Sequence, residues 1–378
     1  MYNSNPVYRF FMQYCKRTIA IIMILLGLIT PVATYAQNFS DVPGDHKNQT
    51  AISYLSDMGV ISGYNDGSFH PGSLINRAEF TKIVMAARFG SSAIDNCISD
   101  KTMPSWSYLF FYDVSLNEWY SKYICSAATN KIINGYPDST FRPSDAINFA
   151  EALKVIINAY NIDVSRVRVI HNSLLYINDS DWFASYFSYA YNKNLINRDK
   201  FYHPAQLMTR GEMAEILYRL NSITESGADE FTTDEQPYSD EYTITIPRLN
   251  IINLNVSFAD PYDSKEALDV LKDGLGHYLS PPGDGKKLVL FGHSSGYSWD
   301  HSAYKTVLRQ INKIQTGDDI YINYHERGYA YQVYKQEILP AGDLGVVMKD
   351  YGYEELALYT CWPPDSIKQR YVVYAAPL

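Results

Sequence analysis

Residues 356–364, Leu-Ala-Leu-Tyr-Thr-Cys-Trp-Pro-Pro, decide the fold of the C-terminal part of this chain. The apolar and aromatic run before Cys361 is typical of a β-strand. Two consecutive prolines cannot continue a hydrogen-bonded ladder, so we expect the strand to end just past Cys361. Arg370 opens the next β-branched run, which places a thiol and a guanidinium on either side of one loop. Because an ordinary thiol is only partly ionised at neutral pH, a fixed positive charge nearby would favour the thiolate.

His293 is the third residue of this candidate site. It is the first polar side chain after the buried-type run Leu-Val-Leu-Phe-Gly at residues 288–292. Cysteine, histidine and arginine at three strand ends would supply a nucleophile, a general acid or base, and a partner for an oxyanion. From spacing alone, a core cysteine with a surface arginine remains an open interpretation.

These motifs resemble those of the sortase family. Residues 357–361, Ala-Leu-Tyr-Thr-Cys, resemble its Thr-Leu-x-Thr-Cys signature with alanine at the first position, and Arg370 and His293 stand at the family's arginine and histidine positions. The resemblance covers residues 241–378 and implies a small mixed β-barrel with Cys361, His293 and Arg370 as catalytic residues. No cofactor or metal is expected. Two flanking segments also match, at residues 244–251 and 304–320.

A second motif overlaps the histidine. Residues 292–296, Gly-His-Ser-Ser-Gly, match the G-x-S-x-G nucleophile elbow of α/β-hydrolases, which would make Ser294 the nucleophile of a serine esterase. That elbow requires a helix directly after it and several parallel strands before it. Tyr-Ser-Trp-Asp follows and is a poor helix start, and too few residues precede the motif for the βαβ units. We therefore expect Ser294 to be a bystander.

Composition and the N-terminal residues limit the number of domains, the class of partner and the cellular location that can be expected. The 378 residues predict two or three domains, and a formal charge of −9 argues against nucleic acid as a partner. Residues 1–36 predict a signal peptide, because two basic residues precede a short apolar run and Thr-Tyr-Ala before Gln37 is an acceptable cleavage site. Cleavage is favoured over retention as an anchor, since the run is shorter than a comfortable membrane span. The remainder is expected to be secreted and to act at the cell surface.

Residues 37–222 contain a repeat of three copies, at residues 37–90, 91–160 and 161–222. Each copy ends in apolar residues at helical spacing, so we expect helix, tight turn, helix in each. A turn of the type Gly-Tyr-x-Asp precedes the last helix in the first two copies. The residue before that helix and a glutamate three residues later have capping-box spacing in all copies, namely Asn76 with Glu79, Asn148 with Glu151, and Thr209 with Glu212.

The three copies resemble S-layer homology (SLH) modules, whose hallmark is a Thr-Arg-Ala-Glu-like motif after such a turn. The resemblance implies an all-α-rich pseudo-threefold trimer whose grooves hold an anionic cell-envelope polysaccharide. Arg77 and Arg210 stand beside helix caps, where free amides also favour anions, whereas Phe149 replaces the arginine in the second copy. Trp119 and Trp182 match a tryptophan of the family, and Lys47 replaces it in the first copy. The candidate polysaccharide-binding residues are therefore Arg77, Arg210, Trp119 and Trp182.

Two features of the chain complete its predicted organisation. Cys97 and Cys125 flank the start of the second copy, where either a disulfide or a pair of buried free thiols fits. Residues 223–240 are acidic and poor in apolar residues, which predicts a flexible linker. In the C-terminal domain, strands are expected at residues 242–246, 287–291, 319–324, 329–338, 355–360 and 371–374, and helices at 264–271 and 302–311.

The sequence thus predicts an extracellular cysteine transpeptidase held on the envelope by its SLH modules. Cys361 would cleave a C-terminal sorting signal through a thioester, and an amine on the cell wall or on a pilin-like protein would accept the acyl group. Two alternatives of another class stay open. One is an envelope-binding structural protein with an inactive C-terminal domain, and the other is a serine esterase that uses Ser294.

Overall fold

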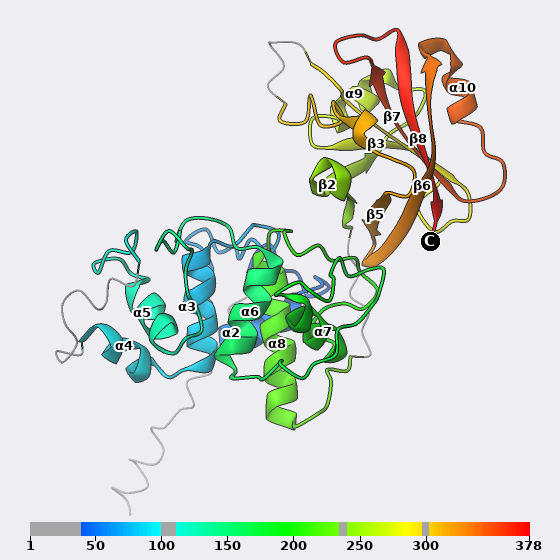
Figure 1. The fold of residues 1–378 in the computed structure, drawn as a ribbon. Helices are drawn as coiled ribbons and strands as arrows, with labels where there is room; N and C mark the ends of the chain where they lie inside the picture. The colour runs from blue at the N-terminus through cyan, green and yellow to red at the C-terminus, as the bar shows by residue number, and fades with distance from the viewer. Residues whose placement is uncertain (1–38, 100–110, 234–239, 297–301) are drawn as a thin grey trace, which may run out of the picture. The chain divides into compact units, whose positions relative to one another are not determined.

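The computed structural model of this chain describes residues 39–99, 111–233, 240–296 and 302–378 (Figure 1). The predicted signal peptide at residues 1–36, and residues 234–239 of the predicted linker, lie outside the described residues. The described residues all belong to one compact unit. Within the described ranges, the longest helices are too short or too polar to cross a lipid bilayer.

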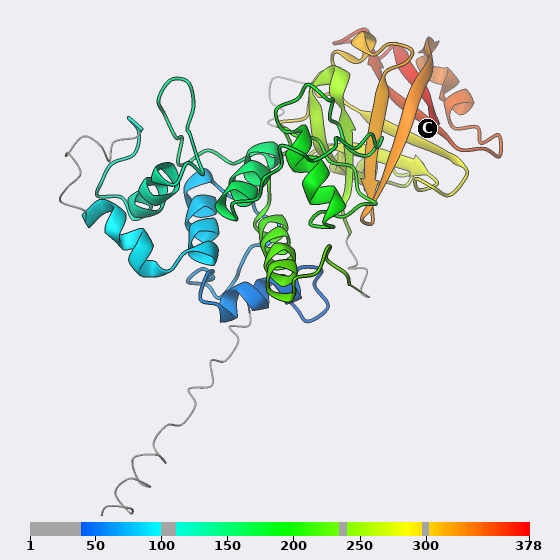
Figure 2. The same ribbon diagram turned by 60° about the horizontal axis from the view of Figure 1, so that its bottom comes forward.

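The N-terminal part is built from helices around one hydrophobic core (Figure 2). Asn76 Oδ1 accepts a hydrogen bond from Glu79 N, Asn148 Oδ1 from Glu151 N, and Thr209 Oγ1 from Glu212 N, at 2.8, 2.9 and 3.1 Å. These bonds confirm the predicted caps. The helices are α2 (Gln49–Asp57), α3 (Arg77–Arg88), α4 (Ser91–Ser99), α5 (Ser121–Thr129), α6 (Phe149–Ala159), α7 (Ala184–Asn192) and α8 (Arg210–Ser226).

A closed cycle of backbone hydrogen bonds joins the three copies just before α3, α6 and α8. Ile75 N donates to Met208 O, Met208 N to Ile147 O, and Ile147 N to Ile75 O, at 3.1, 3.0 and 3.1 Å. Each bond links a different pair of copies, so each copy contacts the other two. The all-α description is not confirmed, because backbone groups ahead of each cap are satisfied by strand-like pairing rather than by a helix. Isolated antiparallel bridges join Leu74 to Thr209, Asn76 to Ala146 and Asn148 to Leu207.

Two features of this part answer or correct the sequence predictions. Cys97 and Cys125 form a disulfide between α4 and α5, with Cα atoms 6.0 Å apart. The predicted linker starts too early, since α8 continues to Ser226 and ends at Gly227, whose φ of 70° suits glycine. Beyond it, Phe231 is buried and lies against Tyr218 with ring centroids 5.6 Å apart. Apolar side chains therefore attach the first half of that segment to α8.

The C-terminal part is a closed barrel with the order β1-β2-β3-β4-β7-β8-β6-β5, in which β1 also pairs with β5. The β2–β3 and β4–β7 pairs are parallel and the other neighbours are antiparallel, which confirms the predicted mixed barrel. The strands are β1 (Tyr242–Ile246), β2 (Ile251–Phe258), β3 (Leu275–Leu279), β4 (Lys287–Gly292), β5 (Asp319–Tyr324), β6 (Arg327–Pro340), β7 (Glu355–Trp362) and β8 (Gln369–Pro377).

Short helices lie between these strands. The predicted helix at residues 264–271 is found as α9 (Ser264–Val270), capped by Asp263. The predicted helix at residues 302–311 is wrong: the chain forms turns there, because Leu308 N donates to His293 O at 2.9 Å and not to the carbonyl four residues earlier. The other short elements are α10 (Leu344–Val347) and the 3-10 turns η1 (Pro247–Leu249), η2 (Ile311–Lys313) and η3 (Ala341–Asp343).

Candidate active site

Cys361 lies near the end of β7, on the outer face of the barrel. Side chains alternate between the two faces of a strand. Leu356 and Leu358 belong to the core inside the barrel, whereas Ala357 and Tyr359 belong to a separate apolar cluster on the outside. Cys361 continues the second series, and it is a partly exposed free thiol.

Register brings Arg370 and His293 to the same place. Cys361 stands directly opposite Arg370 in the antiparallel pair of β7 and β8, and such opposed residues share a face. On the other side of β7, Gly292 of β4 is level with Thr360 in a parallel pair, so His293 follows at the level of Cys361. Phe291 belongs to the outer cluster, and His293 continues that series. The three predicted catalytic residues therefore gather at one end of three adjacent strands.

Hydrogen bonds fix the two loops that carry this cluster. Arg370 Nη1 donates to the backbone oxygens of Ile367 and Gln369, at 2.9 Å each, which ties the guanidinium to the β7–β8 loop. Arg309 Nη1 and Nη2 donate to the two carboxylate oxygens of Asp365 in that loop, at 3.1 and 2.8 Å. Asp365 N in turn donates to Ser295 Oγ at 3.0 Å. The loop after Cys361 is thus attached to the segment that carries His293.

A cavity of about 480 Å³ opens beside His293. Leu268, Leu271 and Ile367 supply apolar surface, and Leu268 and Ile367 are 59% and 77% exposed. Exposed apolar side chains around a polar centre are typical of a site that binds an apolar ligand group. The remaining lining residues are Lys272, Ser295, Gly296, Ser302, Asp365 and Ser366.

Tyr359 lies two residues before Cys361 on the same face of β7, and its phenol stays neutral. Burial raises the pKa of Tyr359 well above its ordinary value, and the charges of Arg370 and Cys361 act on that pKa in opposite directions. The phenol therefore does not ionise near neutral pH and adds no negative charge beneath the thiol.

The structure argues against Ser294 as a nucleophile. Its side chain is 1% exposed, and Ser294 Oγ has no hydrogen-bond partner among the described residues. β4 lies between antiparallel β3 and parallel β7 in a closed barrel, which is not the sheet of an α/β-hydrolase. The first glycine of the motif has a packing reason, since a Cβ at Gly292 would lie 2.5 Å from Leu275 Cδ2.

The arginines predicted to bind polysaccharide are buried between copies. Arg77 Nε donates to Phe141 O at 2.7 Å, and Arg77 Nη1 to Glu151 Oε2 at 2.8 Å. Arg210 Nε donates to Phe69 O at 2.9 Å, and its Nη1 lies 3.7 Å from Glu79 Oε2. Each guanidinium thus holds its own copy to the turn of the next, a structural role beside any binding role.

The predicted tryptophans are half exposed, and each has a lysine beside it. Lys82 Nζ lies 5.9 Å from the Trp119 ring centre, and Lys154 Nζ lies 5.1 Å from that of Trp182. Sequence reasoning missed these lysines, although they occupy the same position of α3 and α6. Trp119, Lys82, Glu79, Tyr64 and Arg210 line a cavity of about 220 Å³, which we name the first groove.

The same five positions recur once more, and by this equivalence of position we name as the second groove the set Trp182, Lys154, Glu151, Tyr136 and Arg77. Arg77 lies 4.8 Å from the Tyr136 ring centre, as Arg210 lies 4.9 Å from that of Tyr64. A cation and an aromatic face suit an anionic sugar, and a carboxylate accepts hydrogen bonds from sugar hydroxyl groups.

Known families match both parts of the chain. The sortase domain model matches residues 244–378, and the S-layer homology domain model matches residues 38–81 and 110–153. The third copy lies outside the SLH matches, although it has the same cap and completes the same cycle of hydrogen bonds.

Two curated relatives and one solved structure are each similar to part of this chain. S-layer protein EA1 of Bacillus anthracis is 31% identical over 139 residues, which are 37% of this chain and 15% of that protein. A cellulosome-anchoring protein of Acetivibrio thermocellus is 32% identical over 118 residues, 31% of this chain and 25% of that protein. The chain therefore spans only a small part of the length of these relatives. Sortase C1 of Streptococcus agalactiae matches 36% of this chain and 66% of its own, with 24% identity and a TM-score of 0.31. The family models thus find two SLH domains in the N-terminal part of the chain and a sortase domain in its C-terminal part, which indicates the bacterial cell envelope as its location.

Proposed function

We propose that this protein is a secreted cysteine transpeptidase anchored to the envelope. The observation that carries the proposal is the register of β4, β7 and β8, which gathers His293, Cys361 and Arg370 at one end of the barrel. A nucleophile, a proton carrier and a fixed cation in one place meet the chemical needs of acyl transfer.

In the first half-reaction, Cys361 Sγ attacks the carbonyl carbon of a peptide bond in a sorting signal. The negative charge that develops on the carbonyl oxygen is stabilised by the Arg370 guanidinium. His293 gives a proton to the leaving nitrogen, the C–N bond breaks, and the downstream peptide departs as an amine. The upstream peptide remains bound to Cys361 as a thioester.

In the second half-reaction, an amine on the cell wall or on a pilin-like protein attacks the thioester carbon. His293 takes a proton from the incoming nitrogen, the C–S bond breaks, and the Cys361 thiolate is restored. A new amide bond joins the two partners, so the reaction needs no oxidant, reductant or metal. The apolar rim formed by Leu268, Leu271 and Ile367 would hold an apolar side chain of the sorting signal.

The SLH part would hold this enzyme on an anionic envelope polysaccharide. In this proposal the three copies form a pseudo-threefold trimer, and the first and second grooves bind carboxylate-bearing sugars through Arg210 and Arg77. Trp119 and Trp182 would stack on the sugar rings.

The test incubates the chain from residue 37 with a library of sorting-type peptides and a small amine. We expect transpeptidation products and an acyl adduct on Cys361 in the intact mass. Cys361→Ala should abolish both, whereas Ser294→Ala should keep activity within about tenfold of wild type. Labelling of Ser294 by a fluorophosphonate, with Cys361→Ala still active, would favour the esterase. Absence of cleavage and adduct under every condition would favour the structural protein.

A further inference from the structure

A third groove is lined by residues of all three copies, and these residues differ from those of the first two grooves. It is lined by Phe149 at the arginine position, Asn197 at the tyrosine position, Glu215 at the lysine position and Lys47 at the tryptophan position. Phe149 N donates to Gln206 O at 2.8 Å, the same bond that Arg77 N and Arg210 N make in their own grooves. The groove is therefore built on the same backbone, but the repeat position that holds Arg77 or Arg210 in the other grooves has no guanidinium to bind a carboxylate.

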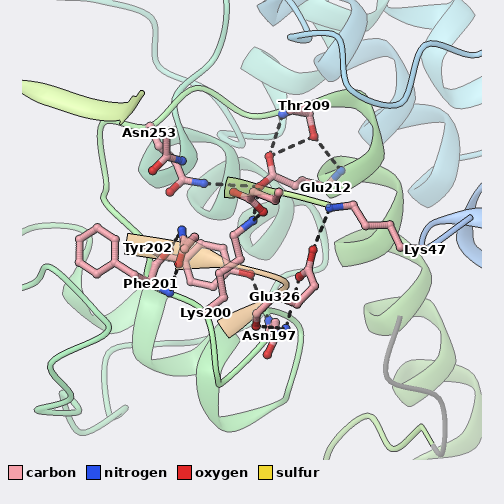
Figure 3. Close-up of polar contacts among 12 residues, drawn as sticks. Lys47, Asn197, Lys200, Phe201, Tyr202, Thr209, Glu212, Asn253 and Glu326 are labelled. Carbon is pink, nitrogen blue, oxygen red and sulfur yellow. Dashed lines mark hydrogen bonds and ion pairs between the residues drawn. The ribbon is translucent and has the colours of Figure 1, made fainter. Parts of the chain in front are cut away.

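A carboxylate from the barrel lies in this third groove. Glu326 lies in the turn between β5 and β6, and its side chain is 14% exposed. Lys47 Nζ donates to Glu326 Oε1 at 2.8 Å, and Asn197 Nδ2 donates to Glu326 O at 3.2 Å (Figure 3). Lys47 replaces the tryptophan of the other grooves and Asn197 replaces the tyrosine, and these two residues thus hold Glu326.

The turn of the third copy makes further contacts with the barrel. Phe201 N donates to Asn323 Oδ1 at 2.8 Å, and Asn323 Nδ2 donates to Phe201 O at 3.0 Å. The Phe201 ring stacks on Tyr321 of β5, with centroids 4.0 Å apart and planes at 10°. A Cβ at Gly328 would lie 2.6 Å from Phe201 N, so the close approach requires glycine there.

Lys200 completes this set of contacts. Its side chain is 4% exposed, and its Nζ lies 2.5 Å from Glu241 Oε2 and 3.6 Å from Glu212 Oε1 (Figure 3). Burial alone would lower the pKa of Lys200, but Glu241 and Glu212 raise it well above its ordinary value, so the ammonium stays charged. A buried cation between two carboxylates is costly to leave without its partners. Lys200 and Phe201 replace Gly67 and Ser68 of the first copy, so the departures of the third copy from the repeat coincide with its contacts to the barrel.

We propose that the third groove is an intramolecular docking site for the catalytic barrel, with Glu326 in place of a saccharide carboxylate. The protein then offers polysaccharide two grooves and holds its active site at a fixed position relative to its anchor. The comparison with the other grooves rests on the proposed function, but docking itself requires neither catalysis nor polysaccharide.

The experiment measures the distance between the two parts in the chain from residue 37. Tyr112 and Tyr262 are 86% and 96% exposed, and Tyr112→Cys with Tyr262→Cys provides two spin-label sites in a Cys361→Ala background. We expect a single narrow distance distribution. The double variant Asn323→Ala/Glu326→Ala should broaden it about twofold or more, since domains without a firm interface move relative to each other. Lys122→Ala, which breaks an exposed pair with Asp95, is the matched control and should change nothing.

Hydrogen exchange of the same variants shows whether the contacts of the third groove are lost while the barrel stays folded. Peptides covering residues 197–203 should exchange about tenfold faster in the double variant, while those of β4 and β7 should keep wild-type protection because the barrel stays folded. If the β4 and β7 peptides also lose protection, Glu326→Ala alone is measured, since it removes no core side chain. A broad distribution in wild type, or an unchanged one in the folded variants, overturns the proposal. Neither measurement contains peptide substrate or polysaccharide, so a failure of docking is distinct from a failure of the proposed function.

Discussion

The SLH part and the barrel place their candidate site residues in different ways. In the SLH part, Arg77 and Arg210 each begin a helix, and the cap that fixes the helix start is the residue immediately before. In the barrel, Cys361, Arg370 and His293 come from β7, from β8 and from the residue after β4, and they meet only because three strands share one register. The first arrangement is local in sequence and repeated, whereas the second is non-local and occurs once.

This difference determines how each site tolerates change. A lost cap affects one copy and a lost arginine affects one contact between two copies, while the backbone bonds between copies stay in place. A slip of one residue between β7 and β8 would move Arg370 to the opposite face from Cys361. We therefore expect the largest single-residue effects in the barrel and smaller effects in the SLH part.

Arg370 should give the largest effect. Arg370→Ala should lower the rate constant of thioester formation about a hundred- to a thousandfold, because in the proposed mechanism Arg370 stabilises the developing oxyanion. Arg309→Ala is the control, since its exposed pair with Asp365 is expected to cost less than about tenfold. The measurement is single-turnover formation of the thioester on a sorting-type peptide. Equal losses of rate in both variants would mean that the position of the β7–β8 loop, and not the place of Arg370 opposite Cys361, determines the rate.

Loss of the disulfide should be the next largest effect and should stay within the SLH part. Replacing Cys97 and Cys125 together by serine removes a cross-link across 28 positions, which is expected to lower the free energy of unfolding by about 3–4 kcal/mol. Hydrogen exchange in rising urea should show α4 and α5 opening earlier while β4 and β7 are unchanged. Earlier opening of the barrel strands would contradict the separation of the two regions.

The two arginines should affect polysaccharide binding next. Arg77→Ala or Arg210→Ala should each weaken binding about ten- to a hundredfold, because a charged hydrogen bond in a partly buried groove is lost. Both arginines also join copies, so their loss could weaken binding through lower stability. Trp119→Ala separates the two effects, because its half-exposed ring can be removed with little change in stability. Sedimentation with purified envelope polysaccharide gives the affinity. A folded Arg77→Ala/Arg210→Ala protein that sediments like wild type would disprove the groove assignment.

The smallest expected effect is a pH dependence in the barrel. Burial lowers the pKa of His277 to about 3, and Tyr242 Oη lies 2.8 Å from its Nδ1. The unfolded state binds a proton near pH 6.5 and the folded state does not, so stability is full above pH 6.5 and falls as the pH drops toward 3. At pH 5 the loss should be about 2 kcal/mol.

His277→Asn should flatten this slope, whereas His171→Asn, at a side chain that is 72% exposed, should leave it unchanged. Urea-dependent hydrogen exchange of β3 and β4 at pH 8 and pH 5 measures both. A slope that persists in His277→Asn would assign it to another group.

The same contrast explains how much the sequence could predict. Caps and helix starts were predictable because Asn76, Asn148 and Thr209 bond within three residues of themselves. The ends of β4 and β7 were predictable because Gly292 and the two prolines after Trp362 interrupt the strands. β2 and β3 were not predicted, because Asn253, Asn255 and the buried His277 interrupt the apolar pattern that marks a strand.

The third groove shows the limit of reading one position at a time. Lys47 and Phe149 were recognised as departures from the repeat, but they belong to different copies. Only the cycle of copies brings them together with Asn197, and only the barrel supplies Glu326. The sequence shows that Lys47 and Phe149 depart from the repeat, but it does not show that Glu326 lies in the groove that they line.

The closed cycle through Ile75, Ile147 and Met208 also fixes how this repeat can evolve. A solenoid adds or loses units at its ends, because each unit contacts only its neighbours. Here each of the three segments donates to one copy and accepts from the other, so the ring has no end at which to insert a duplicated unit. Deleting one copy would break two of the three bonds at once. The third copy is therefore retained because it closes the ring of hydrogen bonds. These bonds do not depend on its surface residues, so the sequence of its turn can diverge.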